Sequence, residues 1–367
     1  MIQQNKKYKI ALIGYRLGIG GAEKVMANLS LFFDQNEIEV HNIIVVNEIS
    51  YQHAGVVLNL GEHKNETNGV FNKLKRLWIL NRYLKEQQFH CIIDFRFRIK
   101  PLQEMLIAKW MYNTKTIFTV HSYLIDHYMP NQTRVTRLMY QNCFKIVTIS
   151  AASQHLIEQK HRLKNVQTIY NPINLEEIEV KKEAFPPLHF SYILGMGQME
   201  TNIKQFDKLI KAYSQSTLPA QNIHLVLLGN GALKAKWQQL ALDLHLADKI
   251  HFLGHQHNPF PYFKHAKFFV LSSLNEGFPN VILESLACGT PVVAFDCLSG
   301  PSEIIVHQQN GLLVENQNTE QLSQAFDRFT ADTTLYNACK AFAYQSVQPF
   351  SLSNIGNQWL RLLNLKG

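Results

Sequence analysis

Short apolar runs alternate with amphipathic segments along the first 170 residues. The runs YKIALIG, VHNIIVV, CIIDF, TIFTV and KIVTI have the length and composition of buried strands. After the first run, residues 22–33 place apolar side chains at helical spacing. Because strands that alternate with helices pair in parallel through right-handed crossovers, this half of the chain predicts a doubly wound α/β domain.

A second alternating series follows residue 188. Its expected strands are HFSYILGMG, HLVLLG, KIHFLG, KFFVLSS and PVVAF, separated by helices such as KQFDKLIKAYSQ. Residues 174–188 are charged, contain proline and lack apolar periodicity, so we place the domain boundary at this point. The pattern predicts two Rossmann-like parallel-sheet domains, residues 1–172 and 173–349, that face each other across a ligand-binding cleft.

Composition indicates a globular protein of a reducing compartment. Hydrophobic residues make up 46% of the chain and charged residues 17%, which excludes a disordered chain. The five cysteines are widely spaced and lack a C-x-x-C pair, so neither a disulfide framework nor a thiolate zinc site is expected. No signal peptide or membrane-spanning stretch is evident. We therefore expect a cytoplasmic protein, either free or peripheral on the cytoplasmic face of the inner membrane.

The formal net charge is +8, and the excess of lysine and arginine lies in the first half of the chain. This asymmetry favours an anionic partner for the first domain, such as a phosphate, a nucleic acid or a lipid surface. Residues 71–85 form a basic amphipathic helix, with an expected apolar face that consists of Phe71, Leu74, Leu77, Trp78 and Leu84. Such a helix either lies on an anionic membrane or covers a protein core, and the sequence leaves both open.

A glycine-rich turn, Gly18-x-Gly20-Gly21, stands between the first strand and the first helix. It allows backbone N–H groups to approach an anion. The turn fails as a dinucleotide fingerprint because Glu23 stands where a small residue is needed, which disfavours an NAD-dependent oxidoreductase. The basic residues are dispersed and no nucleic-acid recognition motif is present, so no nucleic-acid partner is expected.

The most informative segment is residues 269–296, which predicts a strand, a short loop, a helix and a strand. Glu276 precedes the helix and Glu284 lies eight residues later, inside it. A carboxylate in a tight loop at the end of a strand can bind hydroxyl groups, and the free N–H groups of the next helix can hold phosphate. Taken alone, both glutamates could equally be solvated residues near a helix.

The run EGFPNVILESLACGTPVVA, residues 276–294, resembles the E-x7-E motif of the retaining glycosyltransferases of family four, which have the GT-B fold. Shorter pieces support the resemblance in the same order along the chain: GGAE at 20–23, VHS at 120–122, ISAAS at 149–153, YNPI at 170–173 and GNG at 229–231.

The resemblance implies that the second domain binds a nucleotide sugar, that the first binds the acceptor, and that a C-terminal helix, about residues 350–367, packs back on the first domain. It implies catalytic roles for His121, Lys204 and Glu276. The implied donor-binding residues are Gly20, Gly21, Gly197, Gln198, Lys204, Glu276, Gly277, Phe278, Pro279, Asn280 and Glu284. In this assignment Glu284 holds the ribose, Lys204 the diphosphate and Glu276 the donor sugar, while His121 positions the sugar through its backbone.

The chain has no D-x-D motif, so we expect no metal and no other cofactor. The family usually has an arginine where Gln198 stands, and we hypothesise that Arg16 partly compensates for it. The resemblance thus predicts a retaining transfer of a hexose or N-acetylhexosamine from a UDP-sugar to a saccharide acceptor, lipid-linked or phosphorylated, in lipopolysaccharide, capsule or other surface-glycan synthesis. A GDP-sugar donor is the alternative.

Overall fold

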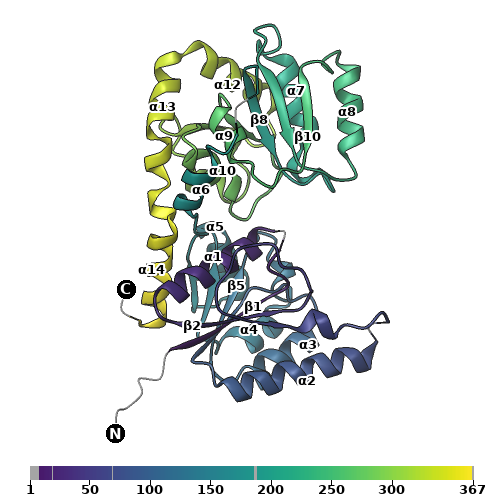
Figure 1. The fold of residues 1–367 in the computed structure, drawn as a ribbon, viewed down its shortest axis with the longest axis vertical. Helices are drawn as coiled ribbons and strands as arrows, with labels where there is room; N and C mark the ends of the chain where they lie inside the picture. Colours follow the sequence, from purple (N-terminus) through teal and green to yellow (C-terminus); the bar gives the residue numbers. More distant parts are fainter. Residues whose placement is uncertain (1–7, 19, 68, 186–187, 366–367) are drawn as a thin grey trace. The chain divides into compact units, whose positions relative to one another are not determined.

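The computed structural model describes residues 8–18, 20–67, 69–185 and 188–365. The chain divides into two compact units, of which unit 1 comprises residues 1–172 and 352–367 and unit 2 comprises residues 173–351. Each unit contains its own parallel sheet covered by helices (Figure 1). The prediction of two doubly wound α/β domains is therefore confirmed.

The sheet of unit 1 has seven strands in the order β3-β2-β1-β4-β5-β6-β7, and all of its described pairs are parallel. The strands are β1 Lys9–Gly14, β2 Glu39–Ile44, β3 Val56–Asn59, β4 Cys91–Asp94, β5 Lys115–Val120, β6 Lys145–Thr148 and β7 Val166–Thr168. The strand order reverses between β1 and β4, and ligands of open parallel sheets bind at the carboxyl ends of strands beside such a reversal.

Helices cover both faces of this sheet, because alternate residues of a strand point to opposite sides. The helices of unit 1 are α1 Gly21–Gln35, α2 Val70–Gln87, α3 Pro101–Leu106, α4 Thr133–Tyr140, α5 Ala151–His161 and α14 Leu352–Leu363, with short turns η1 Leu60–His63, η2 Ile107–Met111 and η3 Ile125–His127. Ile10 and Leu12 of β1 pack with α1 and α14. Ala11 and Ile13 pack on the opposite face, with α2, η2, α4 and α5.

The helix α14 belongs to the core of unit 1 although it is far along the chain from the rest of it. Its buried residues Ile355, Trp359 and Leu360 share a cluster with Phe32 of α1. At Gly356 an added Cβ would lie 2.5 Å from the Phe32 ring. The glycine therefore allows the two helices to approach closely.

The sheet of unit 2 has six parallel strands in the order β10-β9-β8-β11-β12-β13. The strands are β8 Tyr192–Met196, β9 His224–Leu228, β10 Ile250–Gly254, β11 Phe269–Leu271, β12 Val292–Phe295 and β13 Gly311–Val314. The helices are α6 Leu175–Lys181, α7 Phe206–Gln215, α8 Lys234–Asp243, α9 Phe260–His265, α10 Asn280–Ala287, α11 Pro301–Ile304, α12 Thr319–Ala331 and α13 Thr333–Ser346, with η4 Asn202–Lys204 and η5 Gln348–Phe350. The order reverses between β8 and β11.

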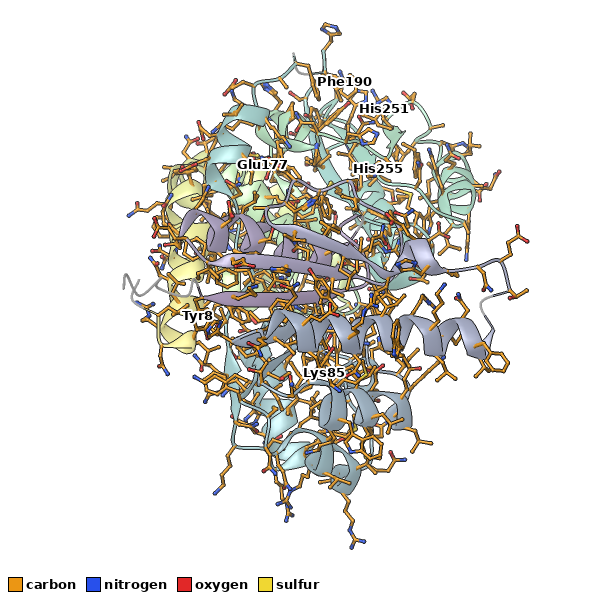
Figure 2. The ribbon with its side chains drawn as sticks, turned by 60° about the horizontal axis from the view of Figure 1, so that its bottom comes forward. Tyr8, Lys85, Glu177, Phe190, His251 and His255 are labelled. Carbon is orange, nitrogen blue, oxygen red and sulfur yellow. The ribbon has the colours of Figure 1, made fainter. Side chains whose placement is uncertain are left out.

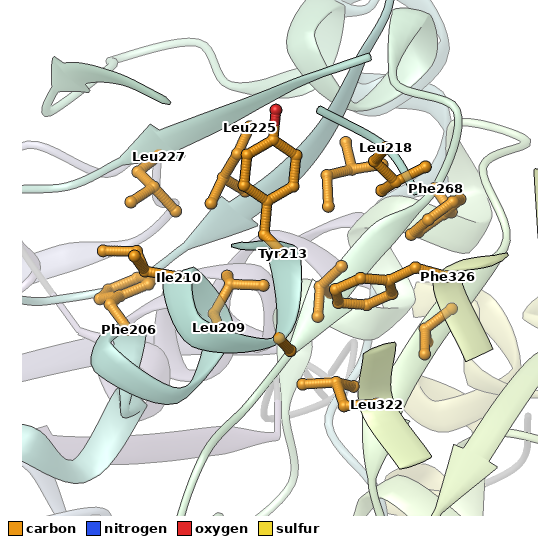
Figure 3. Packing of buried hydrophobic residues seen from close by; sticks show 14 of the residues in the cluster. Phe206, Leu209, Ile210, Tyr213, Leu218, Leu225, Leu227, Phe268, Leu322 and Phe326 are labelled. Atoms are coloured by element: carbon orange, nitrogen blue, oxygen red, sulfur yellow. The ribbon is translucent and has the colours of Figure 1, made fainter. Parts of the chain in front are cut away.

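One face of this sheet is buried under α7 and α12. Figure 3 shows Phe206, Leu209 and Tyr213 of α7 packed with Leu225 of β9 and Phe326 of α12. The Tyr213 hydroxyl donates to the carbonyl oxygen of Ile223 at 2.8 Å, so this buried polar group is satisfied. The cluster fixes the strand ends from which the loops of the candidate site emerge.

Aromatic rings stack beside the outer strands of unit 2. Phe190 lies against the imidazoles of His224 in β9 and His251 in β10, with ring centroids 4.4 and 4.7 Å apart, and Figure 2 labels Phe190 and His251. The two imidazoles are joined between Nδ1 of His224 and Nε2 of His251 at 2.8 Å. Burial lowers the pKa of both histidines.

The sequence pattern missed three strands, and it left the boundary segment without the helix that the structure has there. Strands β3, β7 and β13 lie at sheet edges and are partly exposed, so they lack the continuous buried apolar run by which the equally short β4, β11 and β12 were recognised. Part of the charged segment 174–188 forms helix α6. The Asn174 side chain caps it by accepting a hydrogen bond from the Glu177 N–H at 3.1 Å.

Candidate functional site

Two loops meet where the strand order of unit 2 reverses. One follows β8 and contains Gly197 and Gln198, and the other follows β11 and contains Glu276. The Leu274 N–H donates to the Ile203 carbonyl oxygen at 2.8 Å, which ties the second loop to the first. The carboxyl ends of these strands therefore bring together two of the segments that the sequence singled out.

Glycines allow the loop after β8 to run directly over the loop after β9. The Gly197 N–H donates to the Leu228 carbonyl oxygen at 3.0 Å. Gly229 has φ +128°, and a Cβ there would lie 1.9 Å from the Gly197 carbonyl oxygen. A side chain at position 229 would force the two loops apart, so the GNG segment serves a close backbone approach.

Lys204 and Glu276 form an ion pair across the two loops. Lys204 Nζ lies 2.6 Å from Glu276 Oε1, with side chains 24% and 12% exposed. The aliphatic part of Lys204 crosses Gly197, where a Cβ would lie 2.8 Å from Lys204 Cγ. Gly197 is thus needed for Lys204 to reach Glu276, whereas Gln198 is exposed to solvent.

A hydrogen bond and close packing hold the Gly277–Pro279 loop in place. The Ser299 hydroxyl donates to the Gly277 carbonyl oxygen at 2.8 Å. Gly300 has φ +96°, and a Cβ there would lie 2.4 Å from Pro279 Cδ. The buried Phe278 ring lies 5.6 Å from the Phe350 ring. These contacts fix the entry into α10, which starts at Asn280 with no side-chain cap on its first N–H groups.

Glu284 lies one turn inside α10. Its side chain is half-buried, whereas the flanking Leu283 and Ser285 are buried. The expected apolar stripe of this helix, which includes Ile282 and Leu286, is fully buried and confirmed. Glu276 and Glu284 therefore stand before and within one helix whose opposite face anchors it to unit 2.

In unit 1, the glycine-rich turn leads directly into α1. Gly20 is the N-cap residue with φ 134°, and a Cβ there would lie 2.3 Å from Glu23 Oε2. Burial raises the pKa of the Glu23 carboxyl. Gly21 is the first residue of α1, while residue 19 of the turn lies outside the described residues.

Arg16, proposed to compensate for Gln198, has a partner within unit 1. Its Nη1 lies 2.6 Å from Glu48 Oε2, with both side chains about one-third exposed. A role for Arg16 at a diphosphate therefore requires this pair to open.

His121 follows β5 and is an uncharged group. Burial, assisted by the charge of Arg98, lowers its pKa to about 3. Neither ring nitrogen has a hydrogen-bond partner among the described residues, and the ring lies 5.4 Å from the Phe95 ring. The adjoining cavity has about 10 Å³, which is enough for about one water molecule. An imidazole in this setting stays neutral near pH 7.

A buried ionic network at the end of β4 was not predicted. Arg96 Nη2 lies 2.8 Å from Asp94 Oδ2 and 2.9 Å from Glu104 Oε2. Arg98 is 1% exposed and donates to four backbone carbonyl oxygens, those of Asp94, Arg96, Thr119 and Tyr128. The D-F-R-F-R sequence contains these groups, but nothing in it indicates that both arginines are buried.

Comparison with known proteins agrees with this architecture. Residues 19–177 match the family Glycosyltransferase Family 4, and residues 177–346 match Glycosyl transferases group 1. The N-acetylgalactosamine-N,N'-diacetylbacillosaminyl-diphospho-undecaprenol 4-alpha-N-acetylgalactosaminyltransferase of Campylobacter jejuni is 30% identical, over 97% of this chain and 99% of its own. The chain belongs to glycosyltransferase family four.

Two further proteins resemble this glycosyltransferase, one in sequence and one in fold. The lipopolysaccharide 1,6-galactosyltransferase of Escherichia coli K12 is 24% identical, over 84% of this chain and 85% of its own. The structure of Anabaena Alr3699/HepE in complex with UDP has a TM-score of 0.76 at 18% identity, covering 97% of this chain and 99% of that one. This likeness shows the fold, and the predicted GT-B class of the glycosyltransferase is confirmed.

The described residues of this glycosyltransferase contain neither a group of metal ligands nor a membrane-spanning helix. Among the described residues, no three His, Cys, Asp or Glu side chains are grouped closely enough to hold a metal ion. None of the helices within residues 8–365, apart from the gaps at 19, 68 and 186–187, is long and apolar enough to cross a membrane.

Proposed function

We propose that the protein is a retaining glycosyltransferase that moves a hexose or N-acetylhexosamine from a UDP-sugar to a lipid-linked saccharide acceptor in surface-glycan synthesis. The names of the relatives support this substrate class: one acts on a diphospho-undecaprenol-linked saccharide and another builds lipopolysaccharide. The fold neighbour with bound UDP supports the choice of nucleotide.

The Lys204–Glu276 ion pair at the strand-order reversal is the observation that carries this proposal. A departing UDP gains negative charge on its diphosphate while positive charge builds on the sugar ring. Lys204 is placed to stabilise the first charge and Glu276 to hold the sugar hydroxyls. The N-terminus of α10, which has no side-chain cap, provides further positive potential at the same point.

We propose a front-face reaction that these groups support. The bond between the sugar C1 and the UDP oxygen breaks, and a new bond forms between C1 and the acceptor oxygen on the same side of the ring. The acceptor proton passes to the departing diphosphate, so no protein side chain has to accept it. The uncharged His121 fits this scheme, because its role is then to position the sugar and not to transfer a proton. Lys204 and the α10 N–H groups take the part that a metal ion plays elsewhere, and the reaction is proposed to be metal-independent.

We also propose that unit 1 rests on an anionic membrane. Leu80 and Leu84 of α2 and Ile107 of η2 pack in one core cluster, so both segments cover the same face of the sheet. Large apolar side chains remain exposed at helical spacing on α2 and along α3 and η2, which follow each other in the chain. They are Phe71, Leu74 and Trp78, at 89%, 55% and 57%, and Leu102, Leu106 and Trp110, at 77%, 48% and 78%.

These six exposed side chains form the proposed membrane-docking surface, and the sequence predicted only part of it. Leu77 and Leu84, expected on the same face as Phe71, instead face the core. Helix α2 thus covers the protein core with one side and exposes tryptophan and phenylalanine on another. The exposed Lys75 and Lys109 flank these side chains, a combination that suits an interface with anionic headgroups.

A thermal-shift comparison with UDP, GDP, CMP and NAD tests the donor assignment. At 100 times its Kd a ligand adds about 2.7 kcal/mol to the free energy of unfolding, which raises Tm by several degrees. We expect a shift with UDP that is lost in Glu284→Ala and kept in Glu320→Ala, an exposed carboxylate on α12. A shift with GDP in place of UDP would change the sugar class. A shift with NAD alone, or none with any nucleotide, would overturn the proposal.

A further inference from the structure

A cavity of about 300 Å³ opens in unit 1 at the carboxyl ends of three neighbouring strands. Tyr15 follows β1, Val45 follows β2 and Arg96 follows β4, and all three line it. Helix α2, the turn η1 and the start of α3 form the rest of the wall. The cavity therefore occupies the place where open parallel sheets bind ligands.

The lining is strongly basic. Five of its side chains are cationic, and none of the described residues that line the cavity is acidic. The positive charge of Arg96 is already matched by Asp94 and Glu104, which lie buried behind it. In contrast, Lys73 of α2 and Lys100 at the start of α3 have no ion-pair partner among the described residues. The cavity thus has uncompensated positive charge, which suits an anion that carries more than one negative charge.

The rest of the lining is apolar. Leu77 and Leu80 of α2, Leu60 of η1 and Val45 form a continuous hydrophobic part of the wall. Leu77 and Leu80 belong to the helix that also exposes Phe71 and Trp78. An inorganic anion would leave these side chains unused, whereas an ester of an apolar alcohol would contact them.

We propose that this cavity binds the diphosphate of the acceptor lipid, with the lysine side chains on the phosphates and the first carbons of the lipid chain on the leucine wall. The inference rests on the proposed lipid-linked acceptor and assigns its anionic part to specific residues. Lys73 and Lys100 are binding residues in this assignment, and Tyr15 offers a hydroxyl to the same group. The saccharide joined to the diphosphate then extends from the carboxyl edge of the sheet.

Isothermal titration calorimetry in vesicle-free buffer with saturating UDP tests this site, with geranyl diphosphate, inorganic diphosphate and geraniol as probes. We expect geranyl diphosphate to bind more tightly than either of the other two. The double variant Lys73→Gln/Lys100→Gln should weaken its binding about tenfold or more, because two charge-assisted contacts are lost. Lys85→Gln/Lys164→Gln removes the same charge from exposed positions outside the cavity and should bind as the wild type does.

The outcomes separate this inference from the donor assignment. Equal affinity for geranyl diphosphate and inorganic diphosphate, or unchanged binding by the Lys73/Lys100 variant, would overturn the lipid-diphosphate site. Binding of geraniol as tight as that of its diphosphate would overturn it as well. The UDP-dependent rise in Tm must persist in the double variant, since Lys204, Glu276 and Glu284 lie in unit 2 and neither lysine is among the implied donor-binding residues. If UDP does not raise the Tm of the wild type, the donor proposal is refuted and the lipid-diphosphate site is not.

Discussion

Lys204 Nζ lies 2.6 Å from Glu276 Oε1, so the two proposed catalytic charges neutralise each other before a donor arrives. A diphosphate must compete with Glu276 for the lysine. Replacement of Glu276 by glutamine frees the ammonium without removing it. We predict that Glu276→Gln binds UDP up to about fivefold more tightly, because the free energy of a partly exposed ion pair no longer opposes binding. We also predict that kcat falls. Titration calorimetry and initial rates measure the two effects, and weaker UDP binding would show that the ion pair does not compete.

Lys204→Ala should lower kcat by about 10²- to 10³-fold, because one preorganised cation at the leaving group is lost. Lys211→Ala is the matched control, an exposed lysine on α7 outside the two loops. Steady-state rates with a UDP-sugar provide the measurement. Turnover like that of the wild type in Lys204→Ala contradicts the assignment.

The triple variant Phe71→Ser/Trp78→Ser/Trp110→Ser should bind vesicles of phosphatidylglycerol and phosphatidylcholine about tenfold less well than the wild type, because exposed apolar side chains anchor an interfacial helix. Co-sedimentation measures the bound fraction. Val180→Ser/Leu298→Ser removes exposed apolar side chains from unit 2 and should leave binding unchanged. Wild-type binding should also weaken with added salt. Equal binding by the triple variant would rule out this surface.

The stability of unit 1 should fall as the solution becomes acidic. The pKa of His121 is about 3 in the folded protein, against about 6.5 in an unfolded chain. Below about pH 6.5 His121 binds a proton in the unfolded state but not in the folded state. The free energy of unfolding therefore decreases by up to about 1.4 kcal/mol for each unit by which the pH falls. His224 and His251, whose pKa values are also lowered, act with the same sign in unit 2.

Urea unfolding at pH 7, 6 and 5 measures this dependence. The slope should be smaller in His121→Gln, which cannot take up the proton. The rate of sugar transfer should show no ionisation of His121 between pH 5 and 8. An identical slope in the variant would mean that His121 is not held neutral by burial.

Arg98→Met should destabilise unit 1 by about 3–5 kcal/mol, because four buried carbonyl oxygens lose their donor and the buried Asp94 loses a nearby positive charge. Arg137→Met, an exposed arginine on α4, should change the free energy of unfolding by no more than about 0.5 kcal/mol. Denaturant titration compares the two. A small effect for Arg98→Met would show that water replaces the guanidinium.

The sequence was sufficient for the features that depend on local pattern. The strands that form continuous apolar runs, α10 and its loop with Glu276 could be recognised because their spacing and their glycines serve local geometry. The roles of the buried arginines could not, since Arg96 and Arg98 are polar and their burial depends on Glu104 and on carbonyl groups far along the chain. Helix α2 illustrates the same limit: its periodicity shows apolar residues on more than one side, and only the fold decides which of them face solvent.

The membership of α14 in unit 1 determines the order in which the chain can complete its two cores during synthesis. Residues 173–351 leave the ribosome as one continuous stretch and can close their sheet on their own. The first 172 residues emerge earlier, yet Phe32 and its neighbours stay uncovered until Trp359 and Leu360 arrive. The half of the protein that is translated first is therefore the half that is finished last, and its apolar surface stays exposed for longer during synthesis.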